Sequence, residues 1–162
     1  MLTPTRNLGG SVRCKIAGNS SNAGAPVLVT AAGTGDNTKV TGTTVDRKGT
    51  TGGTLADSCV LAIGWVAALT NAKSLAFAVE IQDSADDSTW NTAVVLQAST
   101  VAKLAGSSTN FSGTVELDVN LAPYARYVRF NITPDLSASG TDTATYSAVC
   151  VLGGHQTSGD AA

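Results

Sequence analysis

Three aspartates, Asp83, Asp86 and Asp87, lie within five positions of one another and are the most suggestive chemical groups of the chain. Carboxylate oxygens suit Ca²⁺, but the segment lacks the ligand spacing and the closing glutamate of a calcium-binding loop. In a hairpin turn, by contrast, Asp and Ser side chains accept hydrogen bonds from nearby backbone N–H groups. We predict a turn, with cation binding as the alternative, and expect Trp90 to begin the returning strand with its ring on the core.

Groups that could catalyse a reaction are sparse. His155 is the only imidazole, and it lies among glycines near the C-terminus, where little would hold a general base in one geometry. Glu80, Glu116 and Asp118 could supply the paired carboxylates of a glycosidase, but each falls on the polar face of an expected strand. We therefore expect no enzyme, no catalytic residue and no cofactor.

The three cysteines, Cys14, Cys59 and Cys150, are far apart and lie among apolar or β-forming residues. Such thiols are usually buried and free, because reduced cysteine packs as a small hydrophobic residue, and a disulfide is the alternative. A structural zinc site needs several Cys or His ligands at short, paired spacing. With no Cys-x-x-Cys and one histidine, we expect no metal site.

The composition indicates a globular chain with small side chains. Ala, Gly, Ser and Thr fill 78 of the 162 positions, hydrophobic residues make up 43%, and the formal net charge is −2. No cluster of Lys or Arg offers nucleic acid an electrostatic footprint. The longest apolar window, residues 59–69, is about half of a membrane span, and the N-terminus lacks the apolar run of a signal peptide. We expect neither a nucleic-acid nor a membrane partner, and synthesis in the cytoplasm.

Strands are predicted by the alternation of apolar and polar residues. Alternation is clearest in residues 75–81, 115–119 and 128–132, whereas residues 59–66 and 146–152 are apolar on both parities. The two doubly apolar segments suit strands covered on both sides, in the middle of a sandwich or at a subunit contact. Weaker strand candidates are residues 12–17, 26–31, 38–45 and 93–96.

Turn residues between these segments fit an all-β chain. We predict a single β-sandwich of jelly-roll or Greek-key type over residues 1–162, with eight or nine strands, little helix, and short flexible arms at 1–10 and 153–162. Of the best helical candidates, residues 65–76 lack a sustained apolar stripe of helical period, and residues 100–105 would form barely a turn and a half.

Arginine and tyrosine cluster in the segment Tyr124-Ala-Arg-Tyr-Val-Arg-Phe130. On the outer face of a strand, Arg126 and Arg129 would ordinarily be solvated or form cross-strand ion pairs with residues such as Glu116 or Asp118. Arg and Tyr together are also favoured at protein contacts. Tyr124, Arg126, Tyr127 and Arg129 are therefore our candidates for a protein interface.

Four blocks of the chain carry a resemblance to a known family. The order Val40-Thr-Gly-Thr-Thr-Val-Asp-Arg47, Ser58-Cys-Val-Leu-Ala-Ile63, the segment from Leu75 to Asp-Ser-Ala-Asp-Asp-Ser-Thr-Trp90, and residues 124–130 resembles the head auxiliary proteins of tailed bacteriophages. These are cement or decoration proteins with a jelly-roll fold. The resemblance spans residues 38–152, with Asp86-Asp87 where the phage sequences often have Asp-Gly.

The resemblance implies a non-catalytic protein on the outside of an assembled capsid. It implies binding to the major capsid protein, which it would cement at junctions between coat subunits, and self-association into a dimer or trimer. The alternative is a carbohydrate-binding sandwich of a tail fibre or surface protein, since the Ala-Arg-Tyr-Val-Arg string also occurs in discoidin-like modules. Exposed aromatics for a sugar would be Tyr124, Tyr127 and Tyr146.

Overall fold

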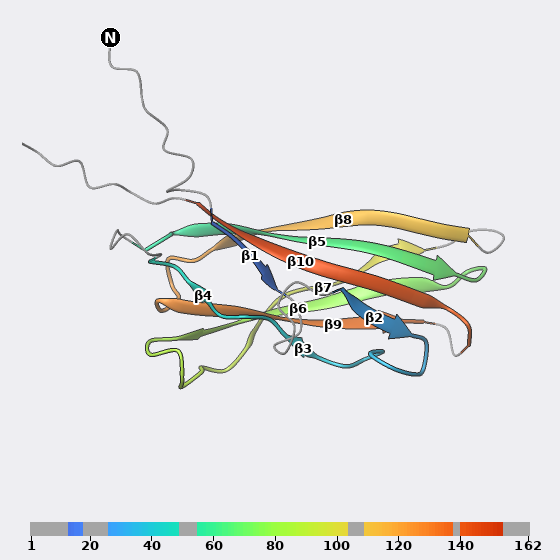
Figure 1. The fold of residues 1–162 in the computed structure, drawn as a ribbon, viewed down its shortest axis with the longest axis horizontal. Helices are drawn as coiled ribbons and strands as arrows, with labels where there is room; N and C mark the ends of the chain where they lie inside the picture. Colours follow the sequence, from blue (N-terminus) through green and yellow to red (C-terminus); the bar gives the residue numbers. More distant parts are fainter. Residues whose placement is uncertain (1–12, 18–25, 49–54, 104–108, 138–139, 154–162) are drawn as a thin grey trace, which may run out of the picture.

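The computed structural model describes residues 13–17, 26–48, 55–103, 109–137 and 140–153, and within these ranges every regular element is a strand (Figure 1). Sheet A contains β1 (Arg13–Ala17), β2 (Val27–Thr30), β5 (Ser58–Leu69), β8 (Thr109–Asn120) and β10 (Thr143–Gly153). Sheet B contains β3 (Val40–Thr41), β4 (Val45–Asp46), β6 (Ser74–Ser84), β7 (Val94–Lys103) and β9 (Tyr127–Leu136). No helix in the described ranges is long and apolar enough to cross a membrane.

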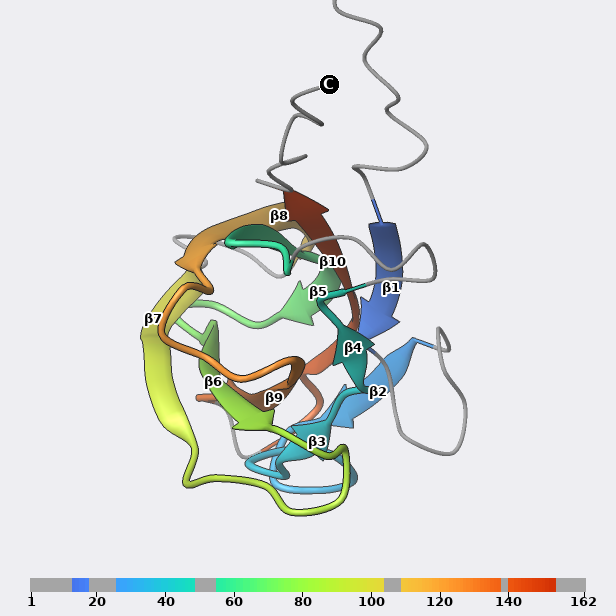
Figure 2. The same ribbon diagram turned by 90° about the vertical axis from the view of Figure 1, so that its left-hand side faces the viewer.

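The strand order is that of a jelly roll. Sheet A runs β1-β10-β5-β8 with β2 also on β10, and sheet B runs β3-β9-β6-β7 with β4 also on β9. β1 and β2 together occupy the first strand position of a jelly roll, β3 and β4 together occupy the second, and β5 to β10 are the third to the eighth. In this numbering the first strand pairs with the eighth, the second with the seventh, the third with the sixth and the fourth with the fifth. All these pairs are antiparallel, and the two sheets face each other (Figure 2). The predicted all-β jelly-roll sandwich is confirmed.

Alternating side chains build the core. On β6, Leu75, Phe77, Val79 and Ile81 are each at most 1% exposed, while the residues between them face outward. The predicted alternation of residues 115–119 and 128–132 corresponds to β8 and β9. The two sheets meet where the Phe77 ring lies 5.1 Å from the Tyr146 ring at an angle of 59°, a tilted aromatic contact across the sandwich.

The two doubly apolar segments lie in β5 and β10, the central strands of sheet A. Their inward residues are buried, as predicted, but no described part of the chain covers their outward residues, which are mostly half-buried. Packing among the described residues therefore does not explain why the outward positions of β5 and β10 are apolar as well. Most are small or β-branched, and these residue types suit a strand on either face.

Several sequence expectations differ from the structure. The helical candidate 65–76 is wrong, because residues 65–69 complete β5, residues 70–73 form a turn and residues 74–76 begin β6. Of the second candidate, residues 100–103 belong to β7 rather than to a helix. Pairing between neighbouring strands satisfies the backbone there, and this overrides local propensity. Gly153 ends β10 and pairs with Ser58 instead of beginning an arm. Residues 1–12 and 154–162, with His155, lie outside the described residues.

Gly113 of β8 gives the Trp65 ring the space it occupies. A Cβ at position 113 would lie 2.6 Å from Cζ2 of Trp65, closer than atoms can pack, whereas a Cβ at Gly64 would meet nothing within 4 Å. The two glycines lie one register step apart on the paired strands β5 and β8. Glycine is therefore required at 113 by the neighbouring ring and not by the backbone.

We predict that Gly113→Ala destabilises the protein by about 1–3 kcal/mol, because the added methyl group displaces a large ring from the core. Gly64→Ala is the matched control, with a free energy of unfolding that is unchanged or higher by up to about 1 kcal/mol, since alanine suits a strand better than glycine. Urea unfolding measures both changes. Equal effects of the two substitutions would contradict this role of Gly113.

Candidate functional site

One end of the sandwich is organised by a buried arginine that the sequence analysis did not single out. Arg47 is 1% exposed, and its guanidinium group donates hydrogen bonds to the carbonyl oxygens of Ala56, Tyr124 and Ala125. These carbonyls belong to the segments before β5 and between β8 and β9, so one side chain ties two loops together. Burial lowers the pKa of Arg47, but a guanidinium group remains charged in proteins.

The alternation of the sequence did contain a signal for Arg47. Val45 is buried and Asp46 faces outward, so the next residue of the same strand pattern points inward. A charge at an inward position needs partners, and here the partners are backbone carbonyls of loops that are distant in the sequence. We call residues 44–47, 83–91 and 121–127 together the Arg47 end.

Arg126, an interface candidate, forms an ion pair at the Arg47 end. Its Nε and Nη2 donate to the two carboxylate oxygens of Asp46 at 3.0 and 2.8 Å, and its guanidinium carbon lies 4.8 Å from the centre of the Tyr127 ring. The hydrogen bonds with Asp46 raise the pKa of Arg126. Tyr124 in the same loop packs partly against the core.

The expected ion pairs of Arg126 and Arg129 with Glu116 or Asp118 are wrong. Glu116 and Asp118 lie on β8 in sheet A, whereas both arginines lie on or beside β9 in sheet B. Although β8 and β9 follow each other in the sequence, they belong to different sheets of the jelly roll, so their residues are not neighbours across a strand pair. A partner for Arg126 comes instead from β4, which pairs with β9.

Arg129 lies on the outer face of sheet B in a polar cluster. Its Nε donates to Oε1 of Gln82 at 3.1 Å, and Nδ2 of Asn131 donates to the same oxygen at 3.0 Å. The guanidinium carbon lies 4.0 Å from the centre of the Trp90 ring, a cation–π contact. Trp90 thus rests against Arg129 outside the sandwich, and the expectation that its ring would lie on the core is wrong.

The acidic segment forms the predicted hairpin turn between β6 and β7. Asp86 accepts hydrogen bonds from the backbone N–H groups of Ser88 and Thr89, and these bonds, above all that with Thr89, hold the pKa of Asp86 far below its ordinary value. Asp83 accepts from Ala125 N at 2.7 Å, and Asp87 from the Thr44 hydroxyl group. Each carboxylate therefore fixes a loop. Within the described ranges no group of three or more His, Cys, Asp or Glu side chains could hold a metal ion.

The remaining carboxylates that sequence reasoning considered for glycosidase chemistry lie on two different sheets. Glu80 faces outward on β6, where Lys39 Nζ lies 2.5 Å from its Oε2, while Glu116 and Asp118 face outward on β8. Glu80 therefore has an ammonium partner and does not face either carboxylate of β8.

Two of the cysteines lie together in the core of sheet A. Cys59 and Cys150 are both buried thiols that are not joined in a disulfide, as predicted, while Cys14 has no described side chain. The hydrogen bond with Cys150 lowers the pKa of Cys59, burial opposes this shift, and the positive charge of Arg47 supports it. Because Cys59↔Leu152 and Leu61↔Cys150 are register partners, the two thiols form a diagonal pair on adjacent strands.

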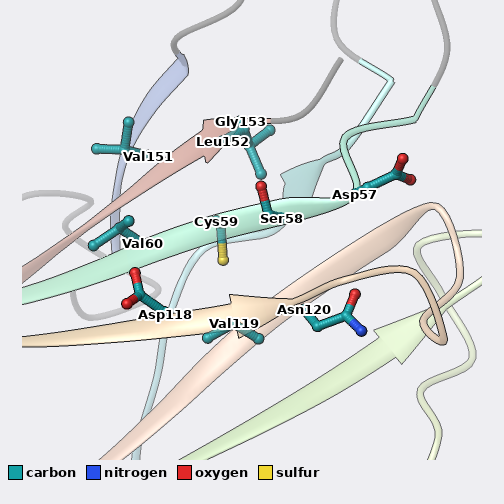
Figure 3. A pocket seen from close by; sticks show the side chains of 10 residues that line it. All are labelled: Asp57, Ser58, Cys59, Val60, Asp118, Val119, Asn120, Val151, Leu152 and Gly153. Atoms are coloured by element: carbon teal, nitrogen blue, oxygen red, sulfur yellow. The ribbon is translucent and has the colours of Figure 1, made fainter. Parts of the chain in front are cut away.

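A groove of 630 Å³ lies at the end of sheet A where β5 begins and β8 and β10 end. It is lined by residues 57–60, 118–120 and 151–153, and Figure 3 shows the carboxylates of Asp57 and Asp118 at separate places along it. Among the described residues that line the groove, the polar side chains are those of Asp57, Ser58, Cys59, Asp118 and Asn120. These residues offer oxygen acceptors beside apolar surface.

The outer face of sheet A is uncharged along its two central strands, β5 and β10. On β5 and β10 the outward side chains from Val60 to Ala68 and from Thr143 to Val151 are all uncharged. Leu28, Thr145 and Val66 lie side by side at one register of β2, β10 and β5, and Leu28 and Val66 are 57% and 55% exposed. Among the side chains that the structure describes on this face, those of Glu116 and Asp118 on the edge strand β8 are charged.

Comparison of the sequence with protein-family models and with curated proteins finds no match. Among solved structures the chain is similar to the capsid protein VP2 of infectious bursal disease virus. The structure of the Gx strain matches at a TM-score of 0.48 and 12% identity over 91% of this chain, and a VP2 subviral particle at 0.43 and 13% over 89%. The chain spans about a third of the length of these proteins, covering 33% of each.

We predict that Arg47→Met lowers the free energy of unfolding by about 3 kcal/mol, because three carbonyl groups in a buried setting lose their donor. Lys48→Met is the control, since Lys48 is the neighbouring residue and is only half-buried. Chemical unfolding gives the free energy, and amide exchange of residues 121–126 reports the loosened loop. A variant with unchanged stability and unchanged exchange would contradict the role of Arg47 as the tie between the loops.

A further prediction concerns the stability of the protein at acid pH. The folded-state pKa of Asp86 lies below that of the unfolded chain, so its stabilising contribution is complete above about pH 5 and declines as the pH falls below about 3.9. Asp86→Ala should therefore lower the urea midpoint at pH 7, with a difference from the native protein that shrinks between pH 5 and pH 2. Asp118→Ala, on the exposed face of β8, controls for a lost negative charge. A difference that stays constant with pH would refute this role of Asp86.

Proposed function

We propose that this protein is a non-catalytic structural protein of a tailed-bacteriophage virion, which binds the outside of the assembled capsid and cements coat subunits together. The observation that carries the proposal is the outer face of the central strands β5 and β10 of sheet A, which is uncharged and which no described part of the chain covers. Such a surface, with Val66 and the neighbouring Leu28 of β2 exposed, suits a broad contact with another protein. The resemblance of residues 38–152 to head auxiliary proteins points to the major capsid protein as the partner.

The chemistry of the described residues is compatible with a contact role. Arg47, Arg126 and the three aspartates of the β6–β7 turn are engaged in holding loops, and the groove beside Cys59 has no organised acid and base. The four interface candidates lie at the Arg47 end or beside it, and their part in a protein contact stays a prediction.

Cementing follows from linkage. A protein that binds the assembled shell more tightly than it binds dispersed coat subunits stabilises the shell by that difference in affinity. A dimer or trimer that touches several coat subunits at once gains further through effective concentration. We therefore propose a homo-oligomer, made in the host cytoplasm and added to the capsid exterior.

The carbohydrate-binding alternative is weakened by where the aromatic side chains lie. Tyr146 is 2% exposed and packs on Phe77, so it is not the exposed aromatic that this alternative needs. Arg129 occupies one face of Trp90, and Arg126 lies over Tyr127. Tyr146 therefore cannot serve as a sugar platform, and one face each of Trp90 and Tyr127 is already occupied.

The test uses particles of the parent phage made without this protein. We expect them to assemble but to lose their genome at a lower temperature and under milder osmotic shock, and purified protein should bind them and restore resistance. Val66→Asp should weaken binding about tenfold or more, because it places a charge in the contact. Thr92→Asp, at an exposed site in the β6–β7 loop, is the control.

Particles that neither bind the protein nor differ in resistance would refute the proposed function. Binding to defined glycans on an array, with no binding to particles, would favour the carbohydrate-binding alternative.

A further inference from the structure

β7 is an edge strand with one side of its backbone uncovered. Within the described ranges it pairs only with β6, and no backbone hydrogen bond joins it to β8, the edge strand of sheet A that follows it in the chain. A long edge of this kind leaves a row of N–H and C=O groups that can accept a further strand.

The other three sheet edges carry features that hinder pairing. β1 and β2 have five and four residues and form an interrupted edge, and β3 and β4 have two residues each. β8 is long, but it presents the exposed carboxylates of Glu116 and Asp118, so that two copies of this edge would repel each other. Short strands and charges are the usual protections of a sheet edge.

β7 is neither short nor charged along its middle, although it has a bulge toward each end, which is a further kind of protection. No residue from Val94 to Ala102 is charged, and Val94 and Val95 are 48% and 63% exposed. Its pairing with β6 is irregular at Leu96 and Val101, which have no register partner and pack against the core. Between these bulges, residues 97–100 pair regularly with 76–79, so the straightest part of the edge is its centre.

We propose that a second copy of the chain pairs with β7 along this edge, antiparallel about a two-fold axis at residues 97–100, so that the B sheets of two copies become continuous. A two-fold contact brings the same strand against itself, and here no register within residues 94–102 sets like charges opposite each other. The axis also keeps the two Lys103 residues at opposite ends of the paired strands. The pairing specifies the surface and the symmetry of the homo-oligomer named in the proposed function. It does not depend on a role of the protein in the virion.

Sedimentation of the full chain in solution tests the pairing. We expect a dimer, and expect Ala98→Lys to raise its dissociation constant at least tenfold, because two ammonium groups then lie close to the axis. Val66→Lys is the matched control, since it adds the same charge at an exposed position on the outer face of sheet A, and it should leave the dimer intact. Amide exchange should show alternate β7 amides protected in the dimer and not in Ala98→Lys.

A monomer up to millimolar concentration, a dimer unaffected by Ala98→Lys, or a dimer dissociated by Val66→Lys instead would each overturn the inference. If Ala98→Lys lowers the unfolding midpoint, Val95→Lys at the more exposed end of the strand takes its place. A monomer that still binds and protects phage particles would overturn the edge pairing and leave the proposed function standing.

Discussion

Burial of one face of each sheet against the other is the interaction on which the structure depends. Phe77 and Tyr146 meet across the sandwich, and the inward residues around them on β5, β6, β9 and β10 are nearly all buried. The sheets need only one face each for this core, which leaves both outer faces free to differ. They do differ: the outer face of sheet B carries Lys39, Glu80, Gln82 and Arg129, while that of β5 and β10 carries no charge.

Much of the fold could be predicted because alternation is a local property. The pattern Leu75, Phe77, Val79, Ile81 defines β6 without reference to any other strand. Partners could not be predicted in the same way. Arg126 pairs with Asp46, 80 positions away, because β4 and β9 lie in one sheet while β8 lies in the other. Arg47 was missed for a related reason, since its acceptors are loop carbonyls that only the closed fold brings together. The jelly-roll winding itself was expected from strand number, turn spacing and resemblance, whereas Trp90 was misplaced because its position depends on Arg129.

The polar groups of the Arg47 end stabilise loops rather than forming a reactive centre. Asp83 and Asp86 accept backbone N–H donors, and Arg47 supplies donors to backbone carbonyls. Loops between sheets carry many backbone groups that no neighbouring strand can satisfy, so side chains take this role. Charges placed in this way give the end a defined shape, whereas the outward side chains of β5 and β10 carry no charge.

The central position of β10 in sheet A sets the order in which the chain can fold as it leaves the ribosome. β10 is the last described strand along the chain, yet it lies between β5 on one side and β1 and β2 on the other. β1 and β2 therefore lack this partner until synthesis has proceeded through β10. Contacts between residues so distant along the chain also slow folding. Until β10 is made, β1 and β2 leave backbone groups unpaired, and unpaired strand edges make a partly folded chain prone to aggregation.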